Sequence, residues 1–416
     1  MTKVQFSDLF VLIDKRLIFL EYLFYRYIEQ ENFNFFSFMR ILVIPDSFKE
    51  CLSAERVSKS IASGIDFVDS SVDVIQFPFS DGGEGAFPVI QKHVAYKLIE
   101  CVTQDAMGNP IKASYLTFND HKTAWIELSK ASGLADVPVE KRSIALASTF
   151  GTGLMVKDAI SKGCTEIILG VGGSATNDGG AGIFQALGGN LQDKSGNELN
   201  KGGSFLSELH LIIAPKNLNH IKWKVAFDVD SPLLGINGAT AVYGPQKGAS
   251  PKDIVLLEQS LNNFCRCISQ QFGRSIGALK GGGAAGGSAA GMYGFFNANL
   301  VSGFSLLAEL VALENEIEKA DLIFTAEGKI DQQSINGKLT GEVARLGKKY
   351  KVPVIGIGGS VEVPFESFIK HGFLDLLSIQ TKGMSLEYSK QNASELIKNA
   401  TSNLFSSFVN ELKKVK

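Results

Sequence analysis

The chain has 416 residues, of which 45% are hydrophobic and 20% charged, and these values predict a soluble globular protein of two or three domains. Its 41 basic and 43 acidic residues leave a formal net charge of −2. This balance argues against nucleic acid as a partner, because phosphate backbones are bound by a basic excess. Glycine, with 43 residues, is the one unusual count, and its clusters indicate loops that bring backbone close to a ligand.

The cysteines and histidines exclude several kinds of site. Five cysteines at irregular spacing predict free thiols in a reducing compartment, and we expect a cytoplasmic protein. None of the five histidines lies beside a glycine-rich motif, so a histidine-based triad or a zinc site is poorly supported.

Residues 1–38 differ from the rest of the chain, since they contain eight of the 29 phenylalanines and no glycine. Apolar residues recur there at helical spacing, but charges interrupt every run before the ~18 residues that a membrane span needs. No cleavage site typical of a signal peptide follows. We interpret this segment as an appendage to a domain that begins at Met39, with a peripheral membrane helix as the alternative.

From Met39 onward, strand-like apolar runs alternate with helix-like stretches, which predicts an α/β fold. Strands are expected at residues 41–44, 72–77, 123–128, 166–170, 222–228, 321–325 and 353–357. Helices are expected at residues 53–64, 149–162, 181–187, 251–272 and 341–350, with Ser53 as an N-cap. The last two strands and their helix form a β-α-β unit, so these strands are expected to be parallel with a right-handed crossover.

The predicted strand ends carry the polar residues of interest. Glycine together with acidic, basic or hydroxyl side chains follows most of them, in segments 45–49, 80–85, 170–180, 228–230 and 325–331. In open α/β sheets, ligands bind beyond the carboxyl ends of the strands. Glycine-rich turns at residues 170–182, 281–291 and 356–359 suit phosphate, because backbone N–H groups at helix N-termini attract anions.

The side chains in these loops favour phosphoryl transfer, which depends on positioning and on charge neutralisation. Carboxylates such as Asp178 and Asp228 suggest Mg²⁺, and lysines neutralise a transferring phosphate. No Walker A motif is present, since Leu339 follows Gly337 and Lys338 where Ser or Thr is required.

A dinucleotide-binding fingerprint is the rival interpretation. Residues 170–175 satisfy its glycine pattern, and Asp193 follows at about the expected distance. However, the loop continues through residues 176–180, where a helix would already run.

From Met39 to its C-terminus the chain resembles the glycerate kinase family whose members open with a PDSFKG-like stretch. The motifs that carry this resemblance are residues 45–49, 80–85, 151–153, 172–182, 228–230, 243–249, 283–287 and 327–331. Departures are few: Glu50 and Ala326 stand where glycine is usual, Lys329 replaces an arginine, and Ser231 replaces an asparagine.

The resemblance implies two dissimilar α/β domains with the active site in the cleft between them. A discontinuous Rossmann-like domain is expected at residues 39–80 and 300–416, and an inserted mixed α/β domain at residues 81–299. The implied reaction is ATP-dependent phosphorylation of D-glycerate, with 2-phosphoglycerate favoured over 3-phosphoglycerate. A nicotinamide-dependent oxidoreductase and a non-catalytic glycerate- or nucleotide-binding protein are the alternatives. The sequence gives no indication of the oligomeric state.

The candidate site residues follow from the strand ends and the resemblance together. The candidate catalytic residues are Lys49, Asp178 and Asp228, and the candidate Mg²⁺ ligands are Asp228 and Asp230. The candidate substrate- and phosphate-binding residues are Asp46, Ser47, Asp81, Gly82, Gly83, Glu84, Gly172, Gly173, Ser174, Thr176, Asn177, Gln246, Lys247, Gly283, Ala285, Glu327 and Lys329. Lys49 and residues 174–177 are the candidates for binding the glycerate carboxylate, while Asp178 or Asp228 is expected to orient the hydroxyl or to hold Mg²⁺.

Overall fold

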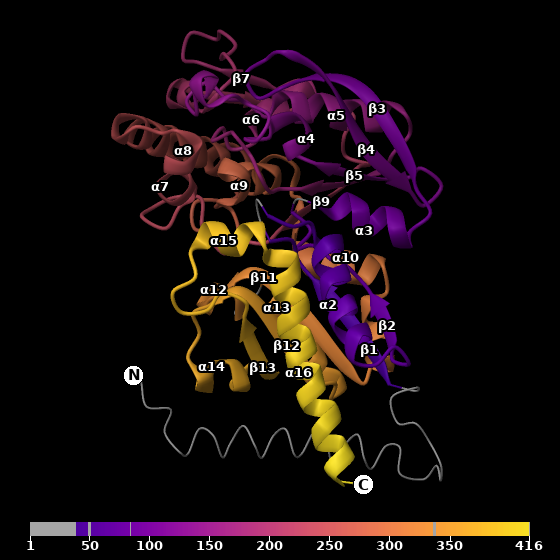
Figure 1. Ribbon diagram of the computed structural model, residues 1–416. Helices are drawn as coiled ribbons and strands as arrows, with labels where there is room; N and C mark the ends of the chain where they lie inside the picture. Colours follow the sequence, from indigo (N-terminus) through magenta and orange to yellow (C-terminus); the bar gives the residue numbers. More distant parts are fainter. Residues whose placement is uncertain (1–38, 49–50, 84, 336–337, 416) are drawn as a thin grey trace. The chain divides into compact units, whose positions relative to one another are not determined.

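The computed structural model describes residues 39–48, 51–83, 85–335 and 338–415 (Figure 1). It divides into two compact units. The first unit consists of the described residues up to Ser80 and of those from Ala312 onward, and the second unit is Asp81–Val311. The sequence-based boundary after residue 299 is corrected here, because β10 (Asn299–Ser302) pairs with a strand of the second unit. The predictions for residues 1–38, Lys49 and Glu84 lie outside the described residues.

The first unit is built on a five-stranded parallel sheet in the order β13-β12-β11-β1-β2. Its strands are β1 (Arg40–Pro45), β2 (Asp73–Gln76), β11 (Leu322–Ile330), β12 (Val354–Val361) and β13 (Phe373–Ser378). Ile41 of β1 lies opposite Leu322 of β11, so the first strand joins the sheet formed by the C-terminal part of the chain, as predicted. The continuous apolar run of β1 is typical of a parallel strand covered on both faces.

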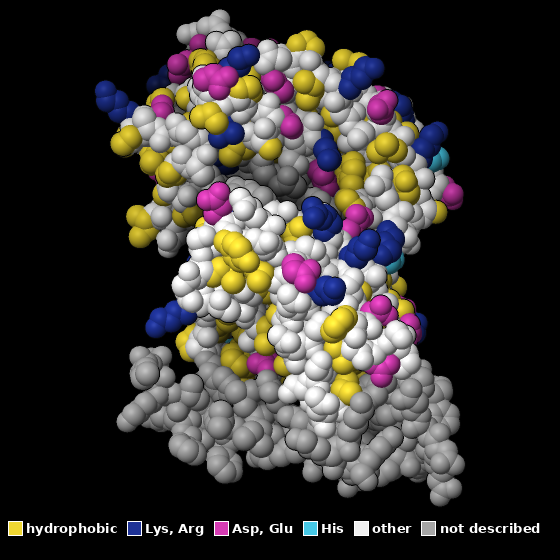
Figure 2. All heavy atoms as spheres, in the orientation of Figure 1, with side chains coloured by type: hydrophobic (Ala, Val, Ile, Leu, Met, Phe, Trp, Pro, Cys, Tyr) yellow, Lys and Arg dark blue, Asp and Glu magenta, His cyan; other side chains and the backbone are white. Residues whose placement is uncertain are grey.

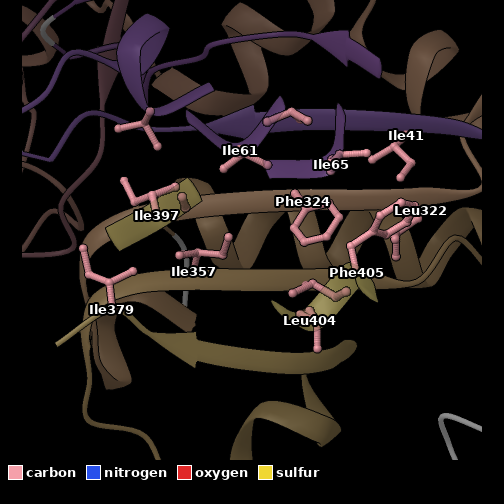
Figure 3. Close-up of a cluster of buried hydrophobic side chains, with 14 of the residues drawn as sticks. Ile41, Ile61, Ile65, Leu322, Phe324, Ile357, Ile379, Ile397, Leu404 and Phe405 are labelled. Atoms are coloured by element: carbon pink, nitrogen blue, oxygen red, sulfur yellow. The ribbon is translucent and has the colours of Figure 1, made fainter. Parts of the chain in front are cut away.

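The helices of the first unit are α2 (Ala54–Val68), α11 (Leu313–Lys319), α12 (Gln332–Ile335), α13 (Leu339–Tyr350), α14 (Phe365–Lys370), α15 (Leu386–Gln391) and α16 (Ala393–Val415). Of these, α2 and α16 bury apolar side chains in the core that covers this sheet. α2 begins at the predicted N-cap, where the Ser53 side chain accepts a hydrogen bond from the Arg56 N–H. Figure 3 shows isoleucines of α2 and the aromatic and aliphatic side chains of α16 gathered over β1, β11 and β12.

The second unit contains a mixed sheet of six strands in the order β10-β9-β6-β5-β4-β3. β3 (Lys97–Gln104) and β4 (Pro110–Phe118) pair antiparallel, and β4 also pairs antiparallel with β5. β5 (Thr123–Glu127), β6 (Glu166–Gly170), β9 (Lys222–Phe227) and β10 run parallel. The helices are α3 (Ala86–His93), α4 (Ser129–Ser132), α5 (Phe150–Ser161), α6 (Ala181–Ala186), α7 (Ala239–Tyr243), α8 (Pro251–Phe272), α9 (Ala284–Phe296) and α10 (Gly303–Leu310). β7 (Asn190–Gln192) and β8 (Leu211–Ile213) form a separate antiparallel pair.

The α/β class is confirmed, and the bounds of α8 coincide with the prediction for residues 251–272. A capping box between Ser250 and Asp253 begins this helix, and Gly273 ends it with a φ of 69°. Both ends of α8 could be predicted from the sequence, because side chains next to the helix and a glycine fix where it begins and ends. The antiparallel strands β3 and β4 were not predicted, and neither was β10.

Two of the predicted loops are strands instead. Residues 327–329 belong to β11 and residues 356–359 to β12, so the prediction of a glycine-rich turn at 356–359 is wrong. Gly356 pairs with Leu376 of β13, and a Cβ at Gly356 would lie 2.4 Å from the Leu376 side chain. Glycine serves here for close packing inside the sheet, which is a common use of glycine in strands.

All five cysteines are free thiols, as the spacing predicted. No helix in the described part of the chain is long and apolar enough to cross a membrane. On the face shown in Figure 2, acidic side chains lie among the basic ones.

Candidate active site

Three of the predicted segments gather near the carboxyl ends of the parallel strands in the second unit: residues 80–85, 170–182 and 281–291. Gly82 approaches the residue that follows β10 so closely that a Cβ at Gly82 would lie 2.5 Å from the Gly303 backbone. A Cβ at Gly170, the last residue of β6, would lie 2.9 Å from the Gly83 carbonyl oxygen. The Asp81 carboxylate accepts a hydrogen bond from the Gly83 N–H at 3.3 Å. The predicted segments 80–85 and 170–182 therefore meet through backbone contacts that only glycine permits.

The glycine-rich segment 281–291 packs against the same loop. Ala285, Gly286 and Gly287 have left-handed backbone angles inside α9, and the Gly286 carbonyl accepts a hydrogen bond from the Gly179 N–H at 3.0 Å. Gly283 N–H donates to the Ser231 carbonyl, which follows β9. Gly283 and Ala285, both predicted as site residues, thus lie where the loops after β6 and β9 meet.

We expect Gly291→Ala to destabilise the second unit by at least about 3 kcal/mol, because a Cβ would lie 1.7 Å from the Gly179 carbonyl oxygen. Gly83→Ala is the matched control, since its nearest atom would be the Gly172 Cα at 3.6 Å. Urea unfolding of both variants measures the difference. Equal midpoints for Gly291→Ala and the wild type would contradict this packing.

Asp178 is fully buried and joins two helix N-termini. Its Oδ2 accepts hydrogen bonds from the Thr149 N–H at 2.8 Å and the Thr149 hydroxyl at 2.9 Å, just before α5. The N–H groups of Gly180 and Gly182, at the start of α6, donate at 3.2 Å each. Burial raises the pKa of Asp178 above its ordinary value, and these hydrogen bonds oppose the shift. Asp178 therefore organises the loop between β6 and α6.

Lys247 holds the same loop from the other side. Its side chain is buried, and its Nζ donates to the Ser174 hydroxyl and to the Thr176 carbonyl, both at 2.8 Å. Burial lowers the pKa of Lys247 to about 7, although the nearby Asp178 carboxylate raises it. The ammonium group is thus placed beside two predicted site residues at the carboxyl edge of the sheet.

Two buried polar atoms in this loop have no hydrogen-bond partner among the described residues. They are Oγ1 of Thr176 and Oδ1 of Asn177, and both side chains are 0% exposed. The Asn177 amide nitrogen donates to the Thr240 hydroxyl at 3.0 Å, which directs the amide oxygen away from α7. Unsatisfied buried acceptors each cost about 1–3 kcal/mol and cluster at functional sites. This loop is therefore the strongest candidate for ligand binding in the second unit.

The structure places the predicted Mg²⁺ ligands directly after β9. Asp228 is half-buried, whereas Asp230 is exposed and lies 3.3 Å from the Lys280 ammonium group. Gln246 is exposed beside the buried Lys247. Within the described residues, no group of three or more His, Cys, Asp or Glu side chains is arranged to hold a metal ion.

The first unit carries a separate set of predicted residues at the carboxyl edge of its own sheet. Asp46 follows β1, and its carboxylate accepts a hydrogen bond from the Ser47 N–H at 2.6 Å. Glu327, in β11, accepts from the Lys338 ammonium at 3.3 Å and from the Thr340 hydroxyl at 3.0 Å. Lys329 is half-exposed and lies 3.0 Å from a carboxylate oxygen of Glu362.

Sequence reasoning missed the residues that support these groups. Thr149 and Thr240 bind Asp178 and Asn177, yet neither lies in a glycine-rich loop. Glu127, at the end of β5, is buried and accepts a hydrogen bond from the Phe87 N–H at 3.1 Å. Glu127 ends a strand, Thr149 directly precedes α5 and Thr240 lies in the first turn of α7, and these positions were the only available indication.

The dinucleotide fingerprint is not borne out by the local structure. α6 begins at Ala181, well after the glycine pattern of residues 170–175, whereas a dinucleotide site needs the helix N-terminus within the pattern. The Asp193 carboxylate accepts hydrogen bonds from the N–H groups of Ser195 and Asn197, at 2.7 and 2.9 Å. Asp193 therefore shapes the turn between β7 and β8.

Both units are α/β structures whose parallel strands carry acidic, amide and lysine side chains at their carboxyl edges. Such a site binds small anionic ligands through cations and backbone N–H groups, and it suits group transfer without a covalent intermediate.

Comparison with known proteins identifies the family. The family model described as "Glycerate kinase family" matches residues 41–409. The chain is 40% identical over 360 residues to "Glycerate kinase" of Bacillus subtilis (strain 168), covering 86% of this chain and 94% of that protein. It is 38% identical over 370 residues to "Glycerate 2-kinase" of Escherichia coli (strain K12), covering 88% and 97%.

A solved structure, "Crystal structure of putative glycerate kinase 2 from Salmonella typhimurium LT2", matches with a TM-score of 0.75. Its sequence identity is 37%, and the match covers 90% of this chain and 99% of that one. The chain belongs to the glycerate kinase family. It is an enzyme, a phosphotransferase with an alcohol group as acceptor.

Proposed function

We propose that this protein transfers the terminal phosphoryl group of ATP to D-glycerate in the presence of Mg²⁺, and that the product is 2-phosphoglycerate. Membership of the glycerate kinase family supports the substrate and the use of ATP. The choice of 2-phosphoglycerate over 3-phosphoglycerate is supported by the relative named glycerate 2-kinase.

The observation that carries the proposal is the buried Lys247 on the loop of Ser174 and Thr176. Phosphoryl transfer to a hydroxyl group of glycerate brings the negative charges of the ATP phosphates close to the negative charge of the glycerate carboxylate. Positioning and neutralising those charges supplies most of the catalysis, because little covalent chemistry is left to the protein. A desolvated ammonium group next to two unsatisfied side-chain oxygens provides a cation for the charge and acceptors for a substrate hydroxyl.

Mg²⁺ fits the donor set after β9. Asp228 and Asp230 offer carboxylate oxygens, and Mg²⁺ is usually bound by one or two carboxylates together with substrate phosphates and water. When bound, Mg²⁺ neutralises charge on the phosphates. Asp228 and Asp230 are the residues that would hold it, while Asp178 positions the loop that carries Ser174 and Thr176.

In the first unit, we assign nucleotide binding to the edge formed by Asp46, Ser47 and the Glu327–Lys338 pair. Lys329 is a further cation at this edge, and its ammonium group is paired with Glu362. Lys49 and Glu84 stay predictions from the family motifs.

An ATP-consumption assay with D-glycerate and Mg²⁺ tests the function, and NMR of the product distinguishes 2-phosphoglycerate from 3-phosphoglycerate. We expect ADP formation that depends on D-glycerate and on Mg²⁺, with 2-phosphoglycerate as the product. Binding of glycerate and ATP without ADP formation would instead indicate a non-catalytic binding protein. Reduction of NAD⁺ with glycerate would indicate the oxidoreductase alternative.

A further inference from the structure

A cavity of about 80 Å³ opens at the carboxyl edge of the sheet in the first unit. Its walls come from the segments that follow β1 and β13, from the C-terminal parts of β11 and β12, and from α15 and the start of α16. One water needs about 10–15 Å³ on the same scale, so the cavity has room for a ring-sized ligand. Among the residues that the structure describes, none of the site residues predicted from the sequence lines it.

The order of the strands explains why a cavity forms here. From β1 the chain proceeds to β2 on one side, whereas β11 is followed by β12 and β13 on the other side. Connections leave the sheet in opposite directions at the boundary between β1 and β11. In open α/β sheets, nucleotides and other ligands bind in the crevice at such a switch point.

The lining of the cavity, a slot between these segments, is mainly apolar. Gly328 and Gly359 contribute backbone only, and a Cβ at Gly359 would lie 2.3 Å from the Gly328 carbonyl oxygen. Phe48 and Ile379 are each 4% exposed and add apolar surface, while Leu386, 61% exposed, stands at the rim. A mainly apolar slot with a few polar groups is typical of sites that bind small molecules and cofactors.

Polar groups are available at the edge of the slot. Gln380 lines the cavity and is held in place by a hydrogen bond from its amide nitrogen to the Met384 carbonyl at 3.2 Å. Cys51 also lines the cavity, and its thiol donates to the Lys390 carbonyl at 3.0 Å. Glu327, paired with Lys338, directly precedes the wall residue Gly328 in β11. The slot thus lies next to the Glu327–Lys338 pair, whose ammonium group is suited to the phosphate end of a nucleotide.

We propose that this cavity binds the adenine ring of the nucleotide. In this assignment, Phe48, Ile379 and the glycine backbones cover the ring, and Cys51 lies at its edge. The assignment rests on the proposed function, since it presumes that ATP is the phosphoryl donor.

Alkylation of Cys51 by iodoacetamide, followed residue by residue with mass spectrometry, tests the proposal on the full chain. We expect saturating ADP to slow the alkylation of Cys51 at least tenfold, and D-glycerate alone to leave it unchanged. Cys101, half-buried in β3 of the second unit, is the internal control, and its rate should not respond to ADP.

A pair of variants provides a second readout. Cys51→Phe fills the slot and should raise the KM for ATP at least tenfold while the KM for D-glycerate stays within twofold. Cys51→Ser preserves the size of the side chain and should leave both KM values within twofold of the wild type. Circular dichroism confirms that both variants are folded.

The results separate this assignment from the proposed function. If the enzyme consumes ATP but ADP does not protect Cys51, and Cys51→Phe keeps its KM for ATP, the base binds elsewhere and the function stands. If calorimetry shows that the protein binds neither ATP nor ADP, both proposals are overturned.

Discussion

Replacing Asp178 by alanine should destabilise the second unit by roughly 3–5 kcal/mol and abolish turnover, because the change leaves several buried hydrogen-bond donors without an acceptor. The N–H groups of Thr149, Gly180 and Gly182 would lose their acceptor in a region that water does not reach. Each unsatisfied buried donor costs about 1–3 kcal/mol. The loop that carries Ser174 and Thr176 would then lose its shape.

Urea unfolding and the ATP-consumption assay measure the two effects. Asp193→Ala is the control, because that carboxylate also accepts backbone hydrogen bonds but lies in a turn near the surface. We expect this variant to lose much less stability than Asp178→Ala and to keep its turnover unchanged. Undiminished turnover by Asp178→Ala would remove Asp178 from the mechanism, including the positioning role.

Lys247→Met should lower kcat/KM by about 10²–10³-fold, which is the usual loss when one donor to a developing charge is removed. The variant should nevertheless be at least as stable as the wild type at pH 6, because methionine fills the volume without burying a charge. This combination of retained stability and lost activity separates a functional lysine from a structural one. Lys252→Met, at an exposed position of α8, is the matched control and should change neither quantity.

The pH dependence of Lys247 follows from its lowered pKa of about 7 against an unfolded value near 10.4. Between these values the unfolded chain binds more protons, so stability rises with pH there. The cost of burying the ammonium is full below pH ~7 and disappears as the pH approaches ~10. The stability of the wild type relative to Lys247→Met should therefore rise by roughly 1.4 kcal/mol per pH unit across this window.

Activity should fall as the pH rises, whereas stability increases, since the charged form of Lys247 is the one that neutralises phosphate. We expect kcat/KM of the wild type to fall as the pH rises through about 7. A wild-type profile that stays flat to pH 9, or a Lys247→Met variant with undiminished kcat/KM, would contradict the assigned role.

The sequence correctly predicted the helix ends that depend on residues close together in the chain. The bounds of α8 follow from Ser250, Asp253 and Gly273, all within or next to the helix. The pairing of β1 with the C-terminal sheet was also expected, because the family resemblance implies a domain made from the start and the end of the chain. The family motifs identified the residues at the strand ends.

The sequence did not predict features that depend on contacts between segments far apart in the chain. The glycines at 356–359 looked like a phosphate turn, but β13 packs so closely on Gly356 that the segment is a strand. The sequence also could not show that Thr149 and two helix N-termini donate hydrogen bonds to the oxygens of Asp178, whose role in binding Mg²⁺ or substrate stays a prediction.

The amino-acid sequence by itself thus determined the α/β class, several of the strands and helices, and the family, because local patterns and motifs carry that information. Only the tertiary structure decided which carboxylate organises a loop, which lysine is desolvated and where a ring-sized cavity opens. Burial and hydrogen-bond partners set those properties, and they arise between segments as far apart as residues 174 and 247, which meet only when the chain folds.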